Sequence, residues 1–376
     1  MFERTRTVVA VAMLTVATYA TAVEMNGGHP DTYVVRKGDT LWDISARFLQ
    51  KPWLWPEIWQ ANPQVKNPHL IYPGDVLSLA YLDRVVAQPG PRQEAPINGV
   101  PLEQVEPFLK QLSVVDEVKS LPYVVNLEDN RLRATTGQTA YVRGLENAQV
   151  GQRYAVVRPT VQYALPKPTE DLNARGETTP GSGNLWKTFI VPSKRHQALG
   201  YELAQINVGT VSRVQSGSVQ VTSLVLQGQV DGREVRAGDR LVPVEARPYD
   251  LQFVPHVPAP QALDLDVRVL AVADTFTSGG PRDVIAISAG RANGVDNGTV
   301  FSLWRQGRHV AHRMDYPNSS RMDDSLTSGA GRVTLPDEYA AHAMVFRTFE
   351  NVSYALVMEG VKPVRVGYSA LHPDKQ

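Results

Sequence analysis

The sequence of 376 residues contains no cysteine and has no formal net charge, with 38 basic and 38 acidic residues. Without cysteine, no disulfide can cross-link the chain and no cysteine can carry a lipid. The same absence excludes cysteine peptidases and cysteine-dependent transpeptidases. The balanced charge gives no support to binding driven by the charge of nucleic acid or of an acidic membrane, so we expect no nucleic-acid partner.

Common signatures of hydrolytic enzymes are also missing. The sequence has no Ser-x-x-Lys motif, no Gly-x-Ser-x-Gly elbow and no His-Glu-x-x-His helix. His309 and His312 form a close pair but lack the further histidine and carboxylate that a zinc hydrolase of the cell wall needs. We therefore expect no metal, no cofactor and no catalytic residue. A glycosidase needs only two carboxylates, which leave no sequence signature, so a hydrolase stays open as an alternative.

The first residues have the pattern of a secretory signal peptide. Arg4 and Arg6 precede an apolar run at residues 8–20, and an Ala-Thr-Ala sequence ends at Ala22. The run is shorter than the roughly 20 residues that a membrane-spanning helix needs. We expect residues 1–22 to be a signal peptide cleaved after Ala22, which places the protein in a periplasm and leaves any outer-membrane attachment to its partners. An uncleaved anchor is the alternative.

Residues 32–82 have the pattern of a very small domain. An alternating strand is followed by a turn at Gly38, and Thr40 is a good N-cap for a helix with apolar residues at helical spacing. Pro56 suits the first turn of a second short helix, which Asn62 and the following proline end. A closing strand follows. The predicted order is strand, helix, helix, strand, in a length at which a core is marginal without cross-links.

This segment resembles a LysM domain. The resemblance is carried by "YVVRKGDTLWDIS" at its start, by Asn62-Pro63 after the second helix, and by "LIYPGDVL" at its end. It covers Thr32 to about Leu82. It implies binding of the N-acetylglucosamine-containing glycan of peptidoglycan or chitin, in a shallow groove between two loops. Carried over to this sequence, the groove residues are Gly38, Asp39, Thr40 and Leu41 in the first loop and Asn67, Pro68, Leu70 and Ile71 in the second.

Such a groove is physically reasonable for an N-acetyl sugar. The sugar offers an amide N–H, a carbonyl and a methyl group, which backbone groups in Gly/Pro-rich loops and an aliphatic floor can match. Two of the residues also have a purely local interpretation. Asp39 can shape the turn, and Thr40 can cap the helix, without either touching a ligand.

Four of the six tryptophans of the chain lie in this small segment. Trp59 falls on the inward stripe of the second helix and Trp55 directly precedes Pro56, so we expect both to pack in the core. Trp42 and Trp53 lie at the margin of the helical pattern, and for these two core packing and stacking on a sugar both stay open.

The chain changes character after the small domain. Residues 83–100 are rich in Pro, Gly and polar residues and are interpreted as a linker. Residues 101–124 are interpreted as a helical connector that packs on the next domain. Its apolar residues on one helical face are Leu102, Val105, Phe108 and Leu109.

The remaining sequence is interpreted as a mainly-β region made of two duplicated β-rich units, at 125–247 and 265–373. Each unit contains a strand, a Gly-x-x-Asn turn, a second glycine and an alternating apolar strand. The matching residues are Gly144, Asn147 and Gly151 in the first unit and Gly290, Asn293 and Gly298 in the second. Both units finish with a glycine turn, at Gly238 and at Gly367.

Each unit also carries a polar, turn-forming insert, at residues 164–197 and 308–329. The two inserts fall at equivalent points of the two units. They predict either one face that contacts a partner or surface loops that are simply tolerated.

The second unit is similar to the C-terminal β domain of the flagellar outer-membrane ring protein family (FlgT). The similarity lies in "GRANGVDNGTVFSLWR" and in "VSYALVMEGVKPVRVGY". A signal peptide, one LysM domain and this β region resemble the architecture of the type IV pilus secretin-associated protein family (TsaP). This resemblance implies that the LysM domain grips peptidoglycan while the rest associates with an outer-membrane secretin ring. The resemblance leaves open whether several copies of this protein form a ring-shaped homo-oligomer.

We therefore expect a non-catalytic periplasmic scaffold that binds peptidoglycan and anchors an outer-membrane secretin complex, that of the type IV pilus, to the cell wall. The alternative is a peptidoglycan hydrolase, or an activator of one, that the LysM domain delivers to its substrate.

Overall fold

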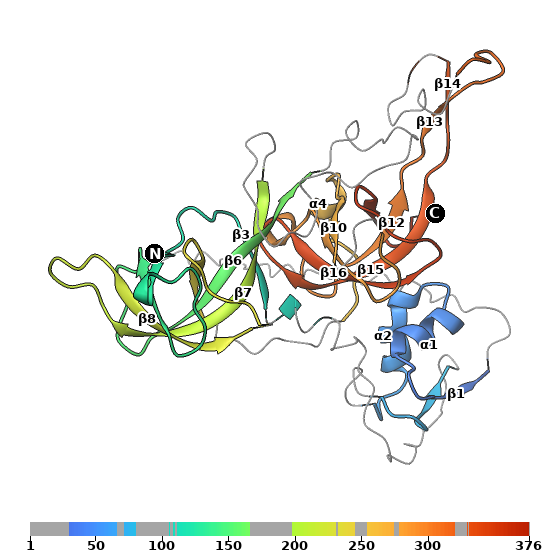
Figure 1. The fold of residues 1–376 in the computed structure, drawn as a ribbon. Helices are drawn as coiled ribbons and strands as arrows, with labels where there is room; N and C mark the ends of the chain where they lie inside the picture. Colours follow the sequence, from blue (N-terminus) through green and yellow to red (C-terminus); the bar gives the residue numbers. More distant parts are fainter. Residues whose placement is uncertain are drawn as a thin grey trace, which may run out of the picture.

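The computed structural model describes residues 30–65, 71–79, 105, 108–109, 111–165, 198–230, 232–244, 254–273, 278–319, 329 and 331–375. The predicted cleavage site at Ala22 and the predicted linker at 83–100 lie outside these residues. Figure 1 shows three bodies: a small N-terminal module with two helices, and two β-rich bodies that follow it along the chain. In the described part of the chain, no helix is both long enough and apolar enough to cross a membrane.

The N-terminal module, residues 30–79, has the predicted order of elements. Strand β1 (Thr32–Val34) is followed by helix α1 (Leu41–Phe48), a 3-10 turn (Pro52–Leu54), helix α2 (Trp55–Gln60) and strand β2 (Val76–Ser78). The two strands pair antiparallel, with Tyr33 opposite Leu77. Tight turns and short helices leave few residues for the interior, so the module buries aromatic as well as aliphatic side chains.

Asn62 ties the end of α2 to strand β2. Its side-chain amide donates to the carbonyl oxygens of Ile58 and Ser78, at 2.6 and 2.9 Å, and its side-chain oxygen accepts the Ser78 N–H at 2.7 Å. The residue is fully buried, and these bonds satisfy its polar atoms there. The Asn62 side chain therefore ends the helix and fixes the closing strand against it.

The first β unit, residues 111–244, is a closed antiparallel sheet. Its strands are β4 (Tyr123–Leu127), β5 (Thr139–Arg143), β6 (Arg153–Ala164), β7 (Ala198–Arg213), β8 (Thr222–Gln229) and β9 (Arg240–Pro243). Going around the sheet, the order is β4, β5, β8, β7, β6, β9 and again β4. A 3-10 turn at Glu128–Asn130 follows β4. The apolar side chains of the strands fill the inside of the closed sheet.

A seventh strand corrects the expectation of a helical connector at 101–124. Val105, Phe108 and Leu109 are helical, but Leu112–Val115 form strand β3, which pairs antiparallel with β7 from Tyr201 to Ala204. β-branched residues at 114 and 115 favour a strand, and the edge of β7 offers backbone partners that a local sequence pattern does not reveal.

The second β unit, residues 254–375, is closed in the same way. Its strands are β10 (Val269–Val272), β11 (Val284–Ile287), β12 (Val300–Arg305), β15 (Glu338–Thr348), β16 (Ser353–Gly360) and β17 (Ser369–Leu371). The order is β10, β11, β16, β15, β12, β17, and a bridge between Arg268 and Ser369 brings β17 back to β10. Helix α4 (Pro260–Leu263) and a 3-10 turn (Arg291–Asn293) lie outside the strands.

The two β units share their strand order and much of their register. Gly238 N–H donates to the Val124 carbonyl at 2.8 Å, and Gly367 N–H donates to the Val269 carbonyl at 2.8 Å. Both glycines have positive φ, 92° and 89°, which glycine adopts without strain. The bulge between β6 and β7 recurs between β12 and β15, at 156–157 and 303–304. Whether the units arose by duplication stays a prediction.

The second polar insert is not only a loop, which corrects the interpretation of residues 308–329. It begins with strand β13 (His309–Ala311), which pairs with β14 (Arg332–Thr334). These two strands extend the direction of β12 and β15 beyond the closed sheet (Figure 1). The first insert lies, from residue 166 on, outside the described residues.

A buried carboxyl group lies where the two β units meet. Oε1 of Glu202 on β7 accepts the Thr160 hydroxyl at 2.5 Å, and Oε2 accepts the hydroxyls of Tyr163 and Tyr354, each at 2.8 Å. Tyr354 belongs to β16 of the second unit, so the hydrogen bonds cross the junction. Burial raises the pKa of Glu202 to about 7.

Candidate functional site

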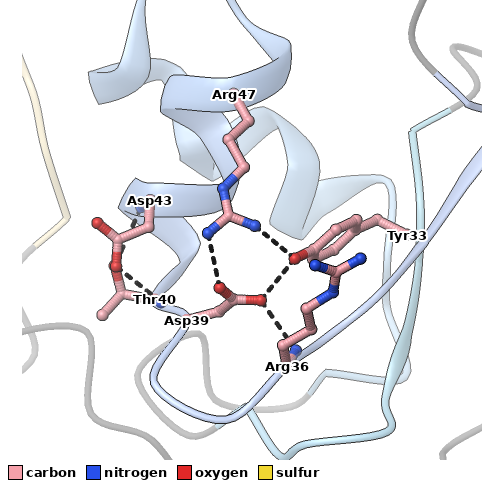
Figure 2. A network of polar contacts seen from close by, with 6 residues as sticks. All are labelled: Tyr33, Arg36, Asp39, Thr40, Asp43 and Arg47. Atoms are coloured by element: carbon pink, nitrogen blue, oxygen red, sulfur yellow. Dashed lines mark hydrogen bonds and ion pairs between the residues drawn. The ribbon is translucent and has the colours of Figure 1, made fainter.

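The loop after β1 is held by one buried carboxylate. Oδ2 of Asp39 accepts the hydroxyl of Tyr33 at 2.7 Å and the backbone N–H of Arg36 at 2.8 Å, and Oδ1 accepts Nη2 of Arg47 at 3.0 Å. Figure 2 shows this network between the loop and helix α1. Asp39 is only 5% exposed, although Arg47 is about half exposed. Both carboxylate oxygens are used within the module, which matches the local interpretation of Asp39 as the residue that shapes the turn.

Tyr33 closes the network from the strand side. Its hydroxyl donates to Asp39 and accepts a 2.6 Å hydrogen bond from Nη1 of Arg47. Burial raises the pKa of Tyr33, and the hydrogen bond to Asp39 and the charge of Asp39 raise it further. The phenol therefore stays neutral, and through Asp39 and Arg47 it ties the loop between β1 and α1 to both of these elements.

Thr40 caps helix α1. Its hydroxyl accepts the backbone N–H of Asp43 at 3.0 Å, while the carboxylate of Asp43 accepts the N–H of Thr40 at 3.1 Å and its hydroxyl at 2.8 Å. This reciprocal pair is a capping box. The hydroxyl of Thr40 is thus engaged at the helix start, as the local interpretation of this residue predicts.

A second Gly-Asp turn, Gly74-Asp75, lies beside Val35, three residues before the Gly38 turn. The Val35 N–H donates to the Asp75 carbonyl and the Gly74 N–H donates to the Val35 carbonyl, both at 2.8 Å. Oδ2 of Asp75 accepts the Tyr72 N–H at 3.1 Å, which repeats the local bond of Asp39 to Arg36. The structure therefore brings together the loop after β1 and the loop before β2. The repeated Gly-Asp pair is the sequence signal that could have pointed to Tyr72 and Asp75.

The other predicted groove residues fall into two groups. Gly38 is exposed, with φ of +88°, and an added Cβ would meet no atom within 4 Å. Leu41 and Ile71 are buried, so they support the two loops from below. Asn67, Pro68 and Leu70 lie outside the described residues.

These features make a surface suited to contacts with backbone groups. The acids of both Gly-Asp turns are used to hold their own loops, and Gly38 leaves open space above its backbone. Among the described residues, no three His, Asp or Glu side chains are grouped as a metal site. The arrangement can bind a neutral ligand that offers amide and hydroxyl groups.

Two of the four tryptophans pack inside the module. Trp55 is buried and contacts the ring of Trp59 at 6.5 Å between centroids. Nε1 of Trp59 donates to the Val65 carbonyl at 2.6 Å. Both residues therefore hold α2 to the rest of the module, as the helical pattern predicts.

The other two tryptophans, Trp42 and Trp53, are buried against the second β unit. Nε1 of Trp42 donates to Oε2 of Glu359 at 3.2 Å, and the ring of Trp53 lies 4.7 Å from that of His342. Trp42 is 2% and Trp53 is 5% exposed. Neither presents a face for stacking on a sugar in this arrangement, which decides the question that the sequence left open.

The module is thereby seated on the second β unit. An ion pair of 2.8 Å joins Lys51 to Asp374, next to the contacts of Trp42 and Trp53. Figure 1 shows α1 and α2 on the side of the second β unit and β1 on the side away from it. The tryptophan contacts come from the helices, so they leave the exposed Gly38 turn uncovered by the second unit.

Comparison with known proteins identifies the module. Residues 33–80 match the LysM domain family. The chain is also similar to the uncharacterized protein YqbP of Bacillus subtilis (strain 168), with 37% identity over 60 residues. That similarity covers 13% of this chain and 27% of YqbP, so the chain spans about a quarter of the relative that it matches.

Proposed function

We propose that the protein is a non-catalytic scaffold that binds peptidoglycan through its LysM domain and holds an outer-membrane complex to the cell wall. Residues 33–80 are a LysM domain, and LysM domains bind peptidoglycan and related N-acetylglucosamine glycans. The observation that carries the proposal is the pair of hydrogen bonds between Val35, which precedes the Gly38 turn, and the Gly74-Asp75 turn, because they bring the loop after β1 and the loop before β2 together on this domain.

The proposed glycan site uses the exposed Gly38 turn as one wall. Asp39 and Thr40 act by fixing the loop, and Leu41 and Ile71 act by supporting it. Asn67, Pro68 and Leu70 belong to the proposed second wall by resemblance to other LysM domains. A loop that is already held by hydrogen bonds loses little conformational entropy when a glycan binds, which favours affinity.

The seating of the LysM domain supports an anchoring role. An anchor must transmit load from the wall to its partner, and contacts such as Trp42–Glu359 and Lys51–Asp374 join the glycan-binding domain directly to the second β unit. A domain on a free tether would transmit load through its linker alone. This observation favours a scaffold over a hydrolase, whose targeting domain needs no fixed orientation.

The location and the partner belong to the same proposal. The Arg4 and Arg6 pattern with Ala22 supports export to the periplasm, where peptidoglycan lies. The shared strand order of the two β units supports duplication of one unit. The resemblance of the second unit to the FlgT C-terminal domain, and of the architecture to the TsaP family, points to a secretin ring of the type IV pilus as the partner.

A sacculus binding experiment tests this function. Purified protein is incubated with purified sacculi, and both the bound fraction and the muropeptide profile are measured. The proposal predicts retention on sacculi with an unchanged profile. Release of soluble wall fragments would instead establish the hydrolase alternative. Co-purification of a secretin from solubilised envelopes tests the partner, and its absence under conditions that retain sacculus binding would remove the secretin from the proposal.

A further inference from the structure

Strands β13 and β14 form an arm with three apolar side chains on one face, beside Arg308, which lies opposite Leu335. Val310 lies opposite Val333 in the ladder, and Leu335 lies two residues further along, on the same face as Val333. Val333 is 46% and Leu335 is 42% exposed. His309 and Thr334 pair on the opposite, polar face. Alternation of this kind is typical of a strand whose apolar face is covered, and a hairpin of two strands is marginal alone.

In the first β unit, the strands equivalent to β13 and β14 are the outer halves of β6 and β7, and their apolar face is covered. The outer halves of β6 and β7 continue beyond their closed sheet as β13 and β14 do, and Tyr163 lies opposite Gly200. The matching ladder ends are Ala164 opposite Ala198 in the first unit and Ala311 opposite Arg332 in the second. This outer ladder packs on the second β unit, where Tyr163 is fully buried and reaches Tyr354.

The surface that receives this ladder belongs to β10, β11 and β16. Three of its apolar residues, all nearly inaccessible, are Leu270, Ala286 and Leu356. Helical residue Phe108 adds to the cover, with its ring 5.6 Å from that of Tyr354.

The first β unit has the equivalent surface on β4, β5 and β8. A bulge at Val125 between β4 and β5 matches the bulge at Leu270 between β10 and β11. Tyr141 takes the place of Ala286, and Val225 takes the place of Leu356. Val125 is 42% exposed, and Tyr141 and Val225 are half-buried. This surface is thus less covered than its counterpart in the second unit, and it mixes these apolar side chains with the polar Asn126, Thr139 and Ser223.

We propose that the arm of one copy packs its apolar face on the β4–β5–β8 surface of a second copy of this chain. The contact would repeat between molecules the packing that joins the two β units within one molecule. A second copy is the partner that the fold suggests, because within one chain the outer β6–β7 ladder already packs on the equivalent surface of β10, β11 and β16. Such a contact is head-to-tail, because each copy offers its arm to one neighbour and its β4–β5–β8 surface to another.

Two single substitutions test the proposal in the full chain. Val333→Asp places a charge on the arm, and Val125→Asp places one on the receiving surface. Both positions are exposed enough to tolerate the change without loss of the fold, which far-ultraviolet circular dichroism verifies. Thr334→Asp, on the polar face of the same arm, is the matched control. The molar mass of each protein is measured by analytical ultracentrifugation over a range of concentrations.

The proposal predicts that the wild type and Thr334→Asp self-associate, and that Val333→Asp and Val125→Asp are each monomers. An equimolar mixture of the two monomeric variants is expected to form a dimer that does not grow, because each partner retains the surface that the other has lost. A monomeric wild type, continued association of Val125→Asp, or a mixture that stays monomeric would overturn the proposal. Association of Val125→Asp would mean that arms pair with arms.

Discussion

Trp42 and Glu359 lie 317 positions apart in the chain, and the indole N–H of the first donates to the carboxylate of the second at 3.2 Å. This bond joins the first helix of the LysM domain to the end of β16. His342 contacts the same carboxylate at 3.1 Å and stacks near Trp53. The glycan-binding domain is therefore positioned by the second β unit, and its orientation is a property of the whole chain.

The first prediction concerns the contact between the LysM domain and the second β unit. Trp53→Ala should remove a buried ring between the LysM domain and the second unit and reduce the free energy of unfolding by about 3 kcal/mol. It should also let the LysM domain separate while it stays folded, because Trp55, Ile58 and the other buried side chains of the module remain in place. Limited proteolysis should then cut between the domains faster than in the wild type. Equal cleavage rates in the two proteins would show that Trp53 does not hold the LysM domain to the second β unit.

The second prediction concerns pH and the junction at Glu202. Burial raises the pKa of Glu202 from 4.5 to about 7. A carboxyl group with a higher pKa in the folded than in the unfolded chain favours folding in its protonated form. Its contribution is full below about pH 4.5 and is lost as the pH rises through about 7, with a largest effect of about 3 kcal/mol.

Glu202→Gln is the matched variant for that prediction, because it keeps the shape and cannot ionise. Thr160, Tyr163 and Tyr354 bond the carboxyl group, and Arg233 adds a favourable charge at longer range. Urea unfolding of both proteins should be measured at pH 5 and pH 8. The wild type is expected to lose stability relative to Glu202→Gln at the higher pH. If the difference in free energy of unfolding between the two proteins were the same at pH 5 and pH 8, ionisation of Glu202 would not be the cause.

The third prediction concerns the loop network of the LysM domain. Asp39→Ala removes the acceptor of three hydrogen bonds and leaves the buried Tyr33 hydroxyl and the partly buried Arg36 N–H without this partner. We expect a loss of about 2 kcal/mol in the stability of the domain. Asp43→Ala, which removes only half of a partly exposed capping box, should cost less, about 1 kcal/mol. The opposite order of the two losses, measured by thermal unfolding, would show that the network is not the main support of the loop.

The sequence predicts the LysM domain well because its signals are local. The Thr40 cap, the proline at position 56 and the turn at Gly38 each act within a few residues, and all appear in the structure. The positions of Asp39 and Thr40 follow from the same local rules. The orientation of their side chains into the loop is consistent with the turn and cap that the pattern predicts.

The contacts between domains could not be predicted in this way. Trp42 and Trp53 are buried by His342 and Glu359, which lie some 300 residues further along the chain. Strand β3 exists because the edge of β7 is available to it. Glu202 lies in a strand where a charged residue usually faces solvent, and only the arrival of Tyr354 from the other unit makes it a buried group.

The most direct test of glycan binding uses two glycines with the same backbone geometry. Gly38 and Gly137 both have φ of +88° and both have open space at Cβ, but Gly137 lies in the first β unit. Asparagine tolerates this conformation, so Gly38→Asn and Gly137→Asn should strain the chain equally. Binding of a soluble N-acetylglucosamine oligomer is measured by titration calorimetry. We predict at least tenfold weaker binding for Gly38→Asn and unchanged binding for Gly137→Asn; equal affinity of the two variants would contradict a glycan site at the Gly38 turn.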